Sequence, residues 1–286
     1  MKRKTLIKLM LALLFAVCII CEILFSANFL NISALNIKTD KTTASFKAVL
    51  VSDLHNKEYG KGNKTLLKTI YEQEPDVIFA VGDMLNKGDK NRKIAIDFYS
   101  ELSKIASVYC CLGNHEDDYY DLEGLKLDMR KAGVNLLYNE METVDFQSGS
   151  ITVGALGYYP SYEGQEPEYN NPARFFLDDF IKQEDENFSI LLMHQPEYFC
   201  WKLKEKKLDL ILCGHTHGGI VRLPFIGGLI APNQGILAHN GDILPDCTKG
   251  YYSSGTANMY ITGGLGNEVF VPRFYNPPEI SVINVN

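Results

Sequence analysis

The sequence has little of what marks several common classes of protein. The five cysteines beyond the N-terminal region have no spacing typical of a structural zinc site. The formal net charge is -7, which argues against a nucleic-acid-coating protein, because such proteins hold phosphate backbones with clustered lysine and arginine. Internal repeats and long low-complexity segments are also missing. What remains is a globular chain whose length suits one large core after the N-terminus.

The longest hydrophobic run is confined to the N-terminal region. Residues 9–25 are almost all apolar, with Glu22 inside the run, and a basic segment over residues 2–8 precedes them. This run is marginal for a membrane span of about 17 to 25 residues, and extending it to residue 30 brings it into range. The sequence therefore predicts a membrane segment over residues 1–30, with its basic flank in the cytoplasm.

Three outcomes are open for this segment: a retained signal anchor, a cleaved signal peptide or a lipoprotein anchor. Neither Cys18 nor Cys21 follows the small residue that lipoprotein processing prefers, and no clear small-x-small cleavage site follows the run. A single-pass anchor in the cell membrane is favoured over cleavage. On this interpretation residues 31–45 form a tether, and residues 46–286 form one domain outside the cytoplasm.

Five of the six histidines lie in short polar clusters, each at the end of an apolar strand-like run. These clusters contain Asp53, His55, Asp83, Asn114, His115, His194, His215 and His217. One histidine after a strand is more often a hydrogen-bonded structural residue than a ligand. Five such placements together favour a site, because imidazole, carboxylate and amide oxygen are the ligands that borderline divalent metals take.

Three glycines strengthen this interpretation. Gly82, Gly113 and Gly214 each precede one of the polar residues, where glycine lets the backbone turn sharply off the strand. The carboxyl ends of strands are also the usual position of sites in open α/β sheets.

The motifs SDLH (52–55), VGD (81–83), GNHE (113–116), MHQP (193–196) and GHTHGG (214–219) resemble the complete motif set of the calcineurin-like metallophosphoesterases. The similarity covers roughly the whole chain after the N-terminal segment, with support from NPPEI (276–280). Within the family, the chain most resembles the membrane-anchored bacterial phosphodiesterases.

The resemblance implies a site with two divalent metal ions, either manganese, iron or zinc. Asp53, His55 and His217 would hold one ion, Asn114, His194 and His215 would hold the second, and Asp83 would bridge them. His115 would face the substrate phosphate as the catalytic residue, where it stabilises charge or protonates the leaving oxygen. The implied fold is α/β, a four-layer αββα sandwich of two mixed sheets flanked by helices.

The chemistry of phosphoester hydrolysis explains these residue types. Two cations about 3.5 to 4 Å apart lower the pKa of a shared water, present it as hydroxide to phosphorus and stabilise charge on the phosphoryl oxygens. A bridging carboxylate reduces the repulsion between the cations. We therefore expect an enzyme that hydrolyses phosphomonoester, phosphodiester or pyrophosphate bonds. The alternatives are a metal-binding scaffold module without turnover and a protein phosphatase.

The pattern of apolar and β-branched residues predicts alternating strands and helices. Strands are expected at 46–52, 77–81, 107–112, 150–156, 188–193, 209–213, 258–262 and 279–284. Helices are expected at 63–73, 91–104, 119–132, 172–183 and 197–206.

Two loops are expected to shape the substrate pocket. Residues 157–171 contain four tyrosines and two prolines, and residues 223–230 follow the GHTHGG motif and are largely apolar. The second loop is either ordinary packing or an apolar lip for a lipid-linked phosphate ester. The expected partners are thus a phosphate-ester substrate, lipid-linked on the second interpretation, and the membrane. Nucleic acid is not expected as a partner. The oligomeric state is left open.

Overall fold

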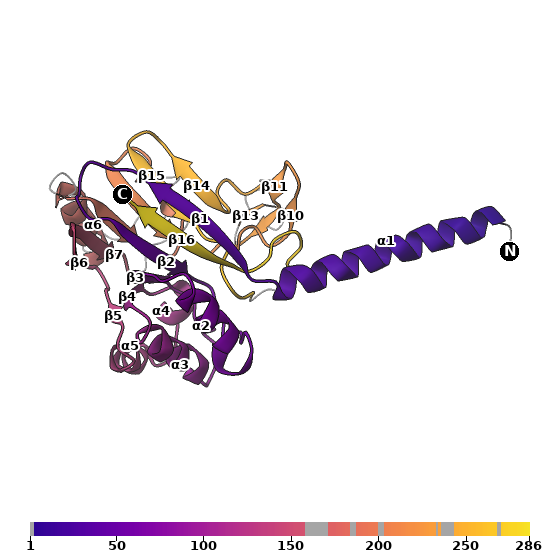
Figure 1. The fold of residues 1–286 in the computed structure, drawn as a ribbon, viewed down its shortest axis with the longest axis horizontal. Helices are drawn as coiled ribbons and strands as arrows, with labels where there is room; N and C mark the ends of the chain where they lie inside the picture. Colours follow the sequence, from indigo (N-terminus) through magenta and orange to yellow (C-terminus); the bar gives the residue numbers. More distant parts are fainter. Residues whose placement is uncertain are drawn as a thin grey trace.

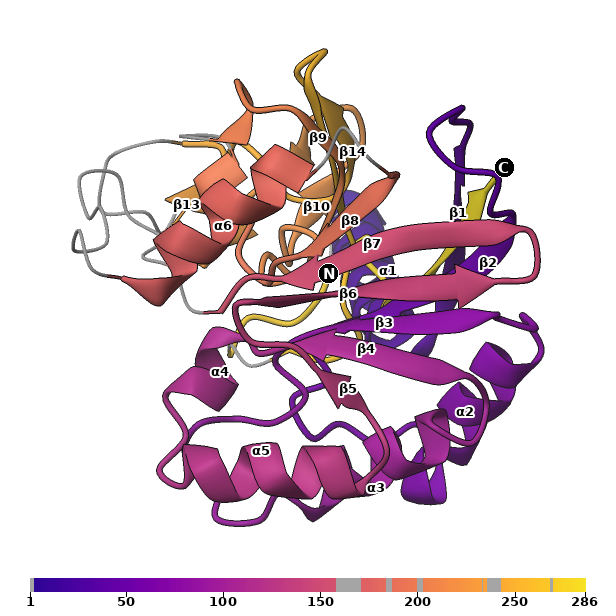
Figure 2. The same cartoon turned by 90° about the vertical axis from the view of Figure 1, so that its left-hand side faces the viewer.

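In the computed structural model, two six-stranded sheets pack face to face, and helices cover the outer face of each (Figure 2). The structure describes residues 3–157, 171–183, 187–199, 203–232, 234–235, 243–267 and 270–286. This arrangement confirms the predicted four-layer αββα sandwich.

The first sheet has the strand order β1-β16-β2-β3-β4-β5. Its strands are β1 (Asn31–Ile37), β16 (Glu279–Val285), β2 (Phe46–Val51), β3 (Val77–Val81), β4 (Ser107–Cys111) and β5 (Asn135–Leu136). The strands from β2 to β5 are parallel, whereas β16 is antiparallel to β2 and parallel to β1. All residues of β3 are buried, as expected for a parallel strand with both faces covered.

The second sheet has the order β14-β15-β9-β8-β7-β6. Its strands are β14 (Gly250–Ser253), β15 (Ala257–Ile261), β9 (Leu208–Cys213), β8 (Ser189–Leu192), β7 (Gly149–Ala155) and β6 (Glu140–Phe146). The four central strands are parallel and the two edge strands are antiparallel to their neighbours. Two short hairpins accompany this sheet, β10 (Arg222–Leu223) with β11 (Gly227–Gly228) and β12 (Ile230–Ala231) with β13 (Gln234–Gly235).

The described helices differ in their partners. They are α1 (Arg3–Asn28), the 3-10 helix η1 (Lys61–Asn63), α2 (Lys64–Tyr71), α3 (Lys93–Leu102), α4 (Asn114–Asp117), α5 (Leu122–Lys131) and α6 (Pro172–Gln183). Helices α2, α3 and α5 cover the first sheet and α6 covers the second (Figure 2). Helix α1 projects away from the sheets as a long isolated rod (Figure 1).

Apolar side chains fill the three spaces between the four layers. Leu50, Phe79, Ile190 and Leu212 belong to the cluster between the two sheets. The clusters under the outer helices contain, for example, Phe98 in α3. Because both ends of each central strand are fixed by this packing, the loops that follow the strands are held at a defined edge of the sandwich.

The segment between α1 and the sandwich differs from the expected tether over residues 31–45. Residues Asn31–Ile37 form β1, which pairs with β16 along its whole length and extends the first sheet. The sequence NISALNI alternates between half-buried and exposed positions, so its polar residues belong to an edge strand rather than to a solvated linker. Only residues 29 and 30 therefore separate α1 from the first sheet.

The eight predicted strands are confirmed, as are the four predicted helices that lie fully within the described residues. Strands β6 and β14 were not predicted, because they are exposed edge strands with polar side chains. The predicted helix at 197–206 includes residues 200–202 and the predicted aromatic loop includes residues 158–170, and both of these segments lie outside the described residues.

Candidate metal centre

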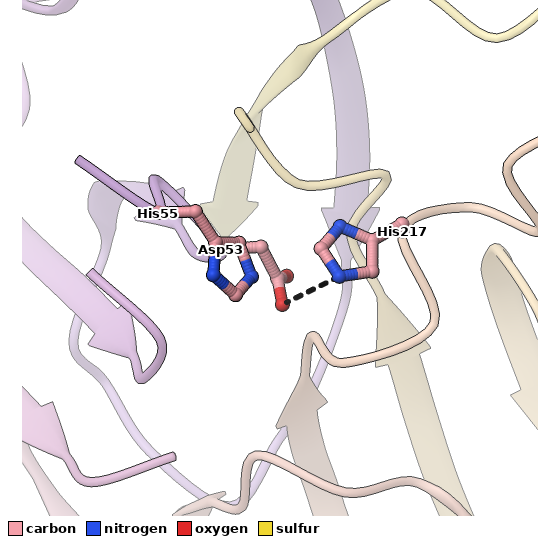
Figure 3. A group of neighbouring side chains, drawn as sticks. All are labelled: Asp53, His55 and His217. Carbon is pink, nitrogen blue, oxygen red and sulfur yellow. Dashed lines mark ion pairs between the residues drawn. The ribbon is translucent and has the colours of Figure 1, made fainter. Parts of the chain in front are cut away.

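Loops from both sheets bring the predicted ligands to one edge of the sandwich. Asp53, His55 and His217 form one triad, whose potential ligand atoms lie within 4.8 Å of one another (Figure 3). The first two residues follow β2, and His217 follows β9. The sandwich thus brings together residues that are more than 160 positions apart in the sequence.

A second triad lies beside the first. It consists of Asp83 after β3, His194 after β8 and His215 after β9, again with potential ligand atoms within 4.8 Å. All six side chains of the two triads are buried. Two separate groups of carboxylate and imidazole ligands are what a pair of divalent cations requires.

The Asp83 carboxylate contacts both triads. Its Oδ2 atom lies 3.0 Å from His194 Nε2 and 3.9 Å from His55 Nε2. Asp53 Oδ1 is also 3.9 Å from His194 Nε2, across the boundary between the triads. A carboxylate in the position of Asp83 can therefore offer an oxygen toward each side.

Asn114 lies next to the second triad at the start of α4. It lines a small pocket together with Gly113, Met193 and His194. Its Oδ1 atom is buried and has no hydrogen-bond partner among the described residues. A buried amide oxygen without a hydrogen-bond partner can serve as a metal ligand that adds no charge.

Several ring nitrogens of the triads share this feature. His55 Nε2, His215 Nε2 and His217 Nδ1 are buried without a hydrogen-bond partner in the described part of the chain. A buried polar atom without a partner is unfavourable and rare in folded proteins. The concentration of such atoms at one position fits a site built for cations.

The charges within the cluster depend on one another. Burial raises the pKa of Asp53 above its usual range. Burial acts in the same direction on Asp83, but the neighbouring His194 outweighs it and holds the pKa of Asp83 below its usual range. Asp83 in turn raises the pKa of His194 to about 10 against the effect of burial. Burial and the charge of His194 lower the pKa of His215 to about 3, so this imidazole stays neutral, whereas His194 would have to release its proton to bind a cation.

Five predicted ligands have a positive backbone φ angle, which residues other than glycine rarely adopt. The φ angles are 54° at Asp53, 50° at His55, 55° at Asp83, 69° at His215 and 50° at His217. Left-handed backbone at such residues costs free energy and is concentrated at functional sites. The tight turns after the strands therefore aim these side chains inward.

Gly113 and Gly214 have a different role from the sharp turn that the sequence suggested. Neither has a left-handed φ; instead, a Cβ atom on Gly113 would lie 2.1 Å from Asp83 Oδ1. A Cβ atom on Gly214 would lie 2.0 Å from Ser52 Oγ and 2.7 Å from Asp53 Oδ2. These glycines leave room for the two carboxylates. Only Gly82 turns the chain in the expected way, with φ 80°.

Glu116 organises the loops after β3 and β4. Its carboxylate accepts hydrogen bonds from the backbone N–H groups of Asp83 (2.7 Å), Met84 (2.7 Å) and Gly113 (2.9 Å). Burial, followed by repulsion from Asp83, raises its pKa to about 7. The only sequence signal for Glu116 was its place in the GNHE motif, and the sequence analysis assigned no role to this residue.

A second carboxylate that the sequence analysis did not single out lies behind His215. Glu197 is buried, and its Oε1 atom is 3.6 Å from His215 Nε2. Gln234 Nε2 donates a hydrogen bond of 3.0 Å to the same oxygen. This is the same ring nitrogen of His215 that is buried without a hydrogen-bond partner, so Glu197 lies beside the proposed ligand atom and does not orient the ring through its other nitrogen.

The backbone of His217 is held by the C-terminal part of the chain. Its carbonyl oxygen accepts hydrogen bonds from Asn276 Nδ2 (2.6 Å) and from an Arg273 guanidinium nitrogen (3.2 Å). Both donors are buried. Asn276 begins the NPPEI segment, so this contact gives a physical reason for that part of the resemblance.

His115 lies beside the two triads without belonging to either. Its ring meets that of His55 edge-on, with centroids 4.9 Å apart. Its Nδ1 atom accepts a hydrogen bond of 3.1 Å from the Lys87 backbone N–H. A neutral His115 therefore carries its proton on Nε2.

Comparison with known proteins agrees with this geometry. Residues 46–219 match the calcineurin-like phosphoesterase family. The chain is 30% identical over 249 residues to YkuE, a metallophosphoesterase of Bacillus subtilis (strain 168), covering 84% of this chain and 79% of that protein. It is 25% identical over 254 residues to the phosphodiesterase YaeI of Escherichia coli (strain K12), covering 85% and 83%. A transmembrane protein with a metallophosphoesterase domain from Danio rerio is 25% identical over 187 residues, covering 64% and 42%.

The chain belongs to the calcineurin-like phosphoesterase family, which confirms the resemblance seen in its motifs. It is a metal-dependent phosphoester hydrolase. Members of this family typically bind two divalent metal ions, in keeping with the two triads.

Proposed function

We propose that this protein is a membrane-tethered phosphoesterase whose two metal ions are held by seven side chains. The observation that carries the proposal is the convergence of two buried ligand triads from four strand ends, with Asp83 in contact with both. When bound, the two cations supply Lewis acidity and a water of lowered pKa.

The seven side chains divide into two sets and a bridge. Asp53, His55 and His217 would hold the first ion. Asn114, His194 and His215 would hold the second, and Asp83 would bridge the two. The buried ligand atoms without hydrogen-bond partners in the described residues support this division, because they include atoms from both sets.

His115 is proposed as the residue that contacts the substrate. Because Nδ1 accepts the Lys87 N–H, a neutral His115 carries its proton on Nε2, and this is the nitrogen that would donate to a leaving-group oxygen. Its backbone N–H donates a hydrogen bond of 2.9 Å to Asp83 Oδ1, which ties its position to the proposed bridge. This geometry suits a general acid beside the metals.

The membrane part of the proposal depends on α1. This helix has 26 residues, is apolar along most of its length and is almost entirely exposed. By length and composition α1 could cross a membrane. The basic residues Arg3, Lys4 and Lys8 at its start favour a cytoplasmic N-terminus, which would place the sandwich outside the cytoplasm.

The proposed substrates are phosphate or pyrophosphate esters linked to lipids. An active site attached to a membrane encounters lipid head groups more often than it encounters soluble metabolites. The loop over residues 223–230 supports this class, because Phe225 and Ile226 are exposed apolar side chains close in sequence to His217.

A screen of metal-supplemented full-length protein against phosphate esters tests the proposal. The panel would contain monoesters, diesters and pyrophosphates, each as a lipid-linked compound and as its water-soluble head-group analogue. Hydrolysis that is lost to a chelator and restored by Mn²⁺, Fe²⁺ or Zn²⁺ is the expected result. Hydrolysis that is unchanged after complete metal removal would contradict the proposal.

A further inference from the structure

The C-terminal end of α1 is fixed to the sandwich by side-chain hydrogen bonds. Glu22 Oε1 accepts a hydrogen bond of 3.0 Å from the Tyr275 backbone N–H. Ser26 is fully buried, donates to Glu22 Oε1 at 2.7 Å and accepts from the Asn276 N–H at 3.3 Å. The charge of Glu22, which is unusual inside an apolar run, is therefore used in a contact with the domain.

A third contact joins the end of α1 to the segment that follows β2. Lys57 Nζ donates a hydrogen bond of 2.6 Å to the Ala27 carbonyl oxygen at the end of α1. Lys57 follows His55 by two residues, and Asn276 holds the His217 carbonyl oxygen. The end of α1 thus touches two segments that carry ligands of the first triad.

These contacts divide α1 into two parts. Glu22, Ser26 and Ala27 are bound to the domain, whereas the apolar side chains before Glu22, such as Leu13 and Phe15, are largely exposed. The free part, residues 3–21, is about 19 residues or roughly 28 Å long at 1.5 Å per residue. This length matches the hydrocarbon core of a bilayer, which is about 30 Å thick. The part of the domain around Tyr275 therefore lies at the membrane boundary if α1 spans the bilayer.

The β10–β11 hairpin stands beside this position. The Arg222 N–H donates to the Phe274 carbonyl oxygen at 2.9 Å, and the Phe274 N–H donates to the Ile220 carbonyl oxygen at 3.2 Å. Phe274 directly precedes Tyr275, so the base of the hairpin is joined to the segment that holds α1. The hairpin and α1 lie on the same side of the domain (Figure 1).

The hairpin presents apolar side chains at its tip without covering them. Phe225 has a relative exposure of 108% and Ile226 of 57%. Phe225 also has φ 67°, a conformation that is costly for a bulky side chain. Isolated exposed apolar residues are normal on protein surfaces. An adjacent pair on a strained tip, on the same side of the domain as an apolar helix, points to a partner that covers it.

We propose that the tip of the β10–β11 hairpin is a second membrane contact, which inserts Phe225 and Ile226 into the bilayer beside α1. Tyr275, which is half exposed, lies between the two contacts and suits the interface, where aromatic rings with a polar group gather. The inference rests on the proposed membrane anchoring by α1. It deepens the proposed function, because two contacts fix the orientation of the domain and hold the first triad near the lipid head groups.

Quenching of tryptophan fluorescence by lipids that carry a doxyl group tests this contact in the full chain. In a Trp201→Phe background, Phe225→Trp places the single tryptophan at the hairpin tip. Leu127→Trp is the matched control, because Leu127 is 52% exposed on α5, on a part of the domain away from α1 (Figure 1). Met10→Trp reports the insertion of α1 itself. Each variant would be incorporated into nanodiscs with and without doxyl phosphatidylcholine.

Quenching at Phe225→Trp at least about twofold stronger than at Leu127→Trp is the expected result. Quenching at Met10→Trp together with no excess at Phe225→Trp would overturn the hairpin contact and leave the anchor intact. No quenching at Met10→Trp would overturn both the anchor and the contact. A tryptophan at position 225 that is shielded from iodide but not quenched by lipid would assign the tip to a protein partner or a second copy, and would also overturn the proposal.

Discussion

Replacing Gly113 by alanine tests whether the close approach of backbone and carboxylate positions Asp83. The added Cβ would lie 2.1 Å from Asp83 Oδ1 and 2.7 Å from the Asp83 backbone nitrogen. Ordinary van der Waals contact requires about 3.5 Å, so the carboxylate must move by more than about 1 Å. Glu116 holds the backbone of both residues, which prevents the loops from moving apart to relieve this contact.

The expected loss follows from this displacement. A misplacement of about 1 Å in an active site can lower the rate about 10²-fold, which corresponds to roughly 2.7 kcal/mol. Because Asp83 contacts both triads, we expect at least this loss in kcat/KM for Gly113→Ala. We also expect fewer bound metal ions per chain.

The assay combines steady-state hydrolysis of p-nitrophenyl phosphate esters, metal content by inductively coupled plasma mass spectrometry, and thermal unfolding. Gly88→Ala is the matched control, because a Cβ on Gly88 meets no atom within 4 Å and its φ is not left-handed. This control should retain kcat/KM within about twofold, as expected for a substitution that touches no special feature. A Gly113→Ala protein with wild-type kcat/KM and metal content would refute the reasoning.

Four further results are expected. Asp83→Ala should lose both metal ions, and retention of two ions per chain would contradict its bridging role. His115→Ala should keep both ions and lower kcat by about 10² to 10⁴, with a smaller loss for good leaving groups; equal losses for p-nitrophenyl and alkyl esters would exclude a proton donor. Replacing both Phe225 and Ile226 by serine should narrow the kcat/KM advantage of lipid-linked esters over their head-group analogues, and an unchanged ratio would argue against the apolar lip. Protease added to intact bacterial spheroplasts should remove residues from about Asn31 onward, whereas protection until lysis would place the domain in the cytoplasm.

The central strands could be predicted because they are buried, whereas the sandwich itself was implied by the resemblance to the family. VIFAV in β3 and LDLILC in β9 are apolar runs that end in polar clusters, and both features survive in the structure. The edge strands escaped prediction for the opposite reason. NISALNI in β1 is half exposed and polar, and its pairing with β16 depends on a partner about 250 residues away, which no local pattern reveals.

The residues of the two triads could be predicted because each motif is local and ends a strand. Their mutual distances could not be predicted, since these depend on how the two sheets pack. Glu197 illustrates the limit, because a carboxylate after a proline has no distinctive pattern, and its distance of 3.6 Å to His215 Nε2 arises from the fold alone. The same holds for Glu22, whose charge was noticed but whose partner, the Tyr275 N–H, is remote in sequence.

Anomalous X-ray scattering from crystals of the metal-loaded protein, measured on both sides of the metal absorption edge, tests the central claim most directly. The account predicts two anomalous peaks about 3.5 to 4 Å apart. One should lie about 2.0 to 2.2 Å from ligand atoms of Asp53, His55 and His217, and the other at similar distances from those of Asn114, His194 and His215. Asp83 should contact both. A single peak, or two peaks outside these residues, would contradict the two-metal centre.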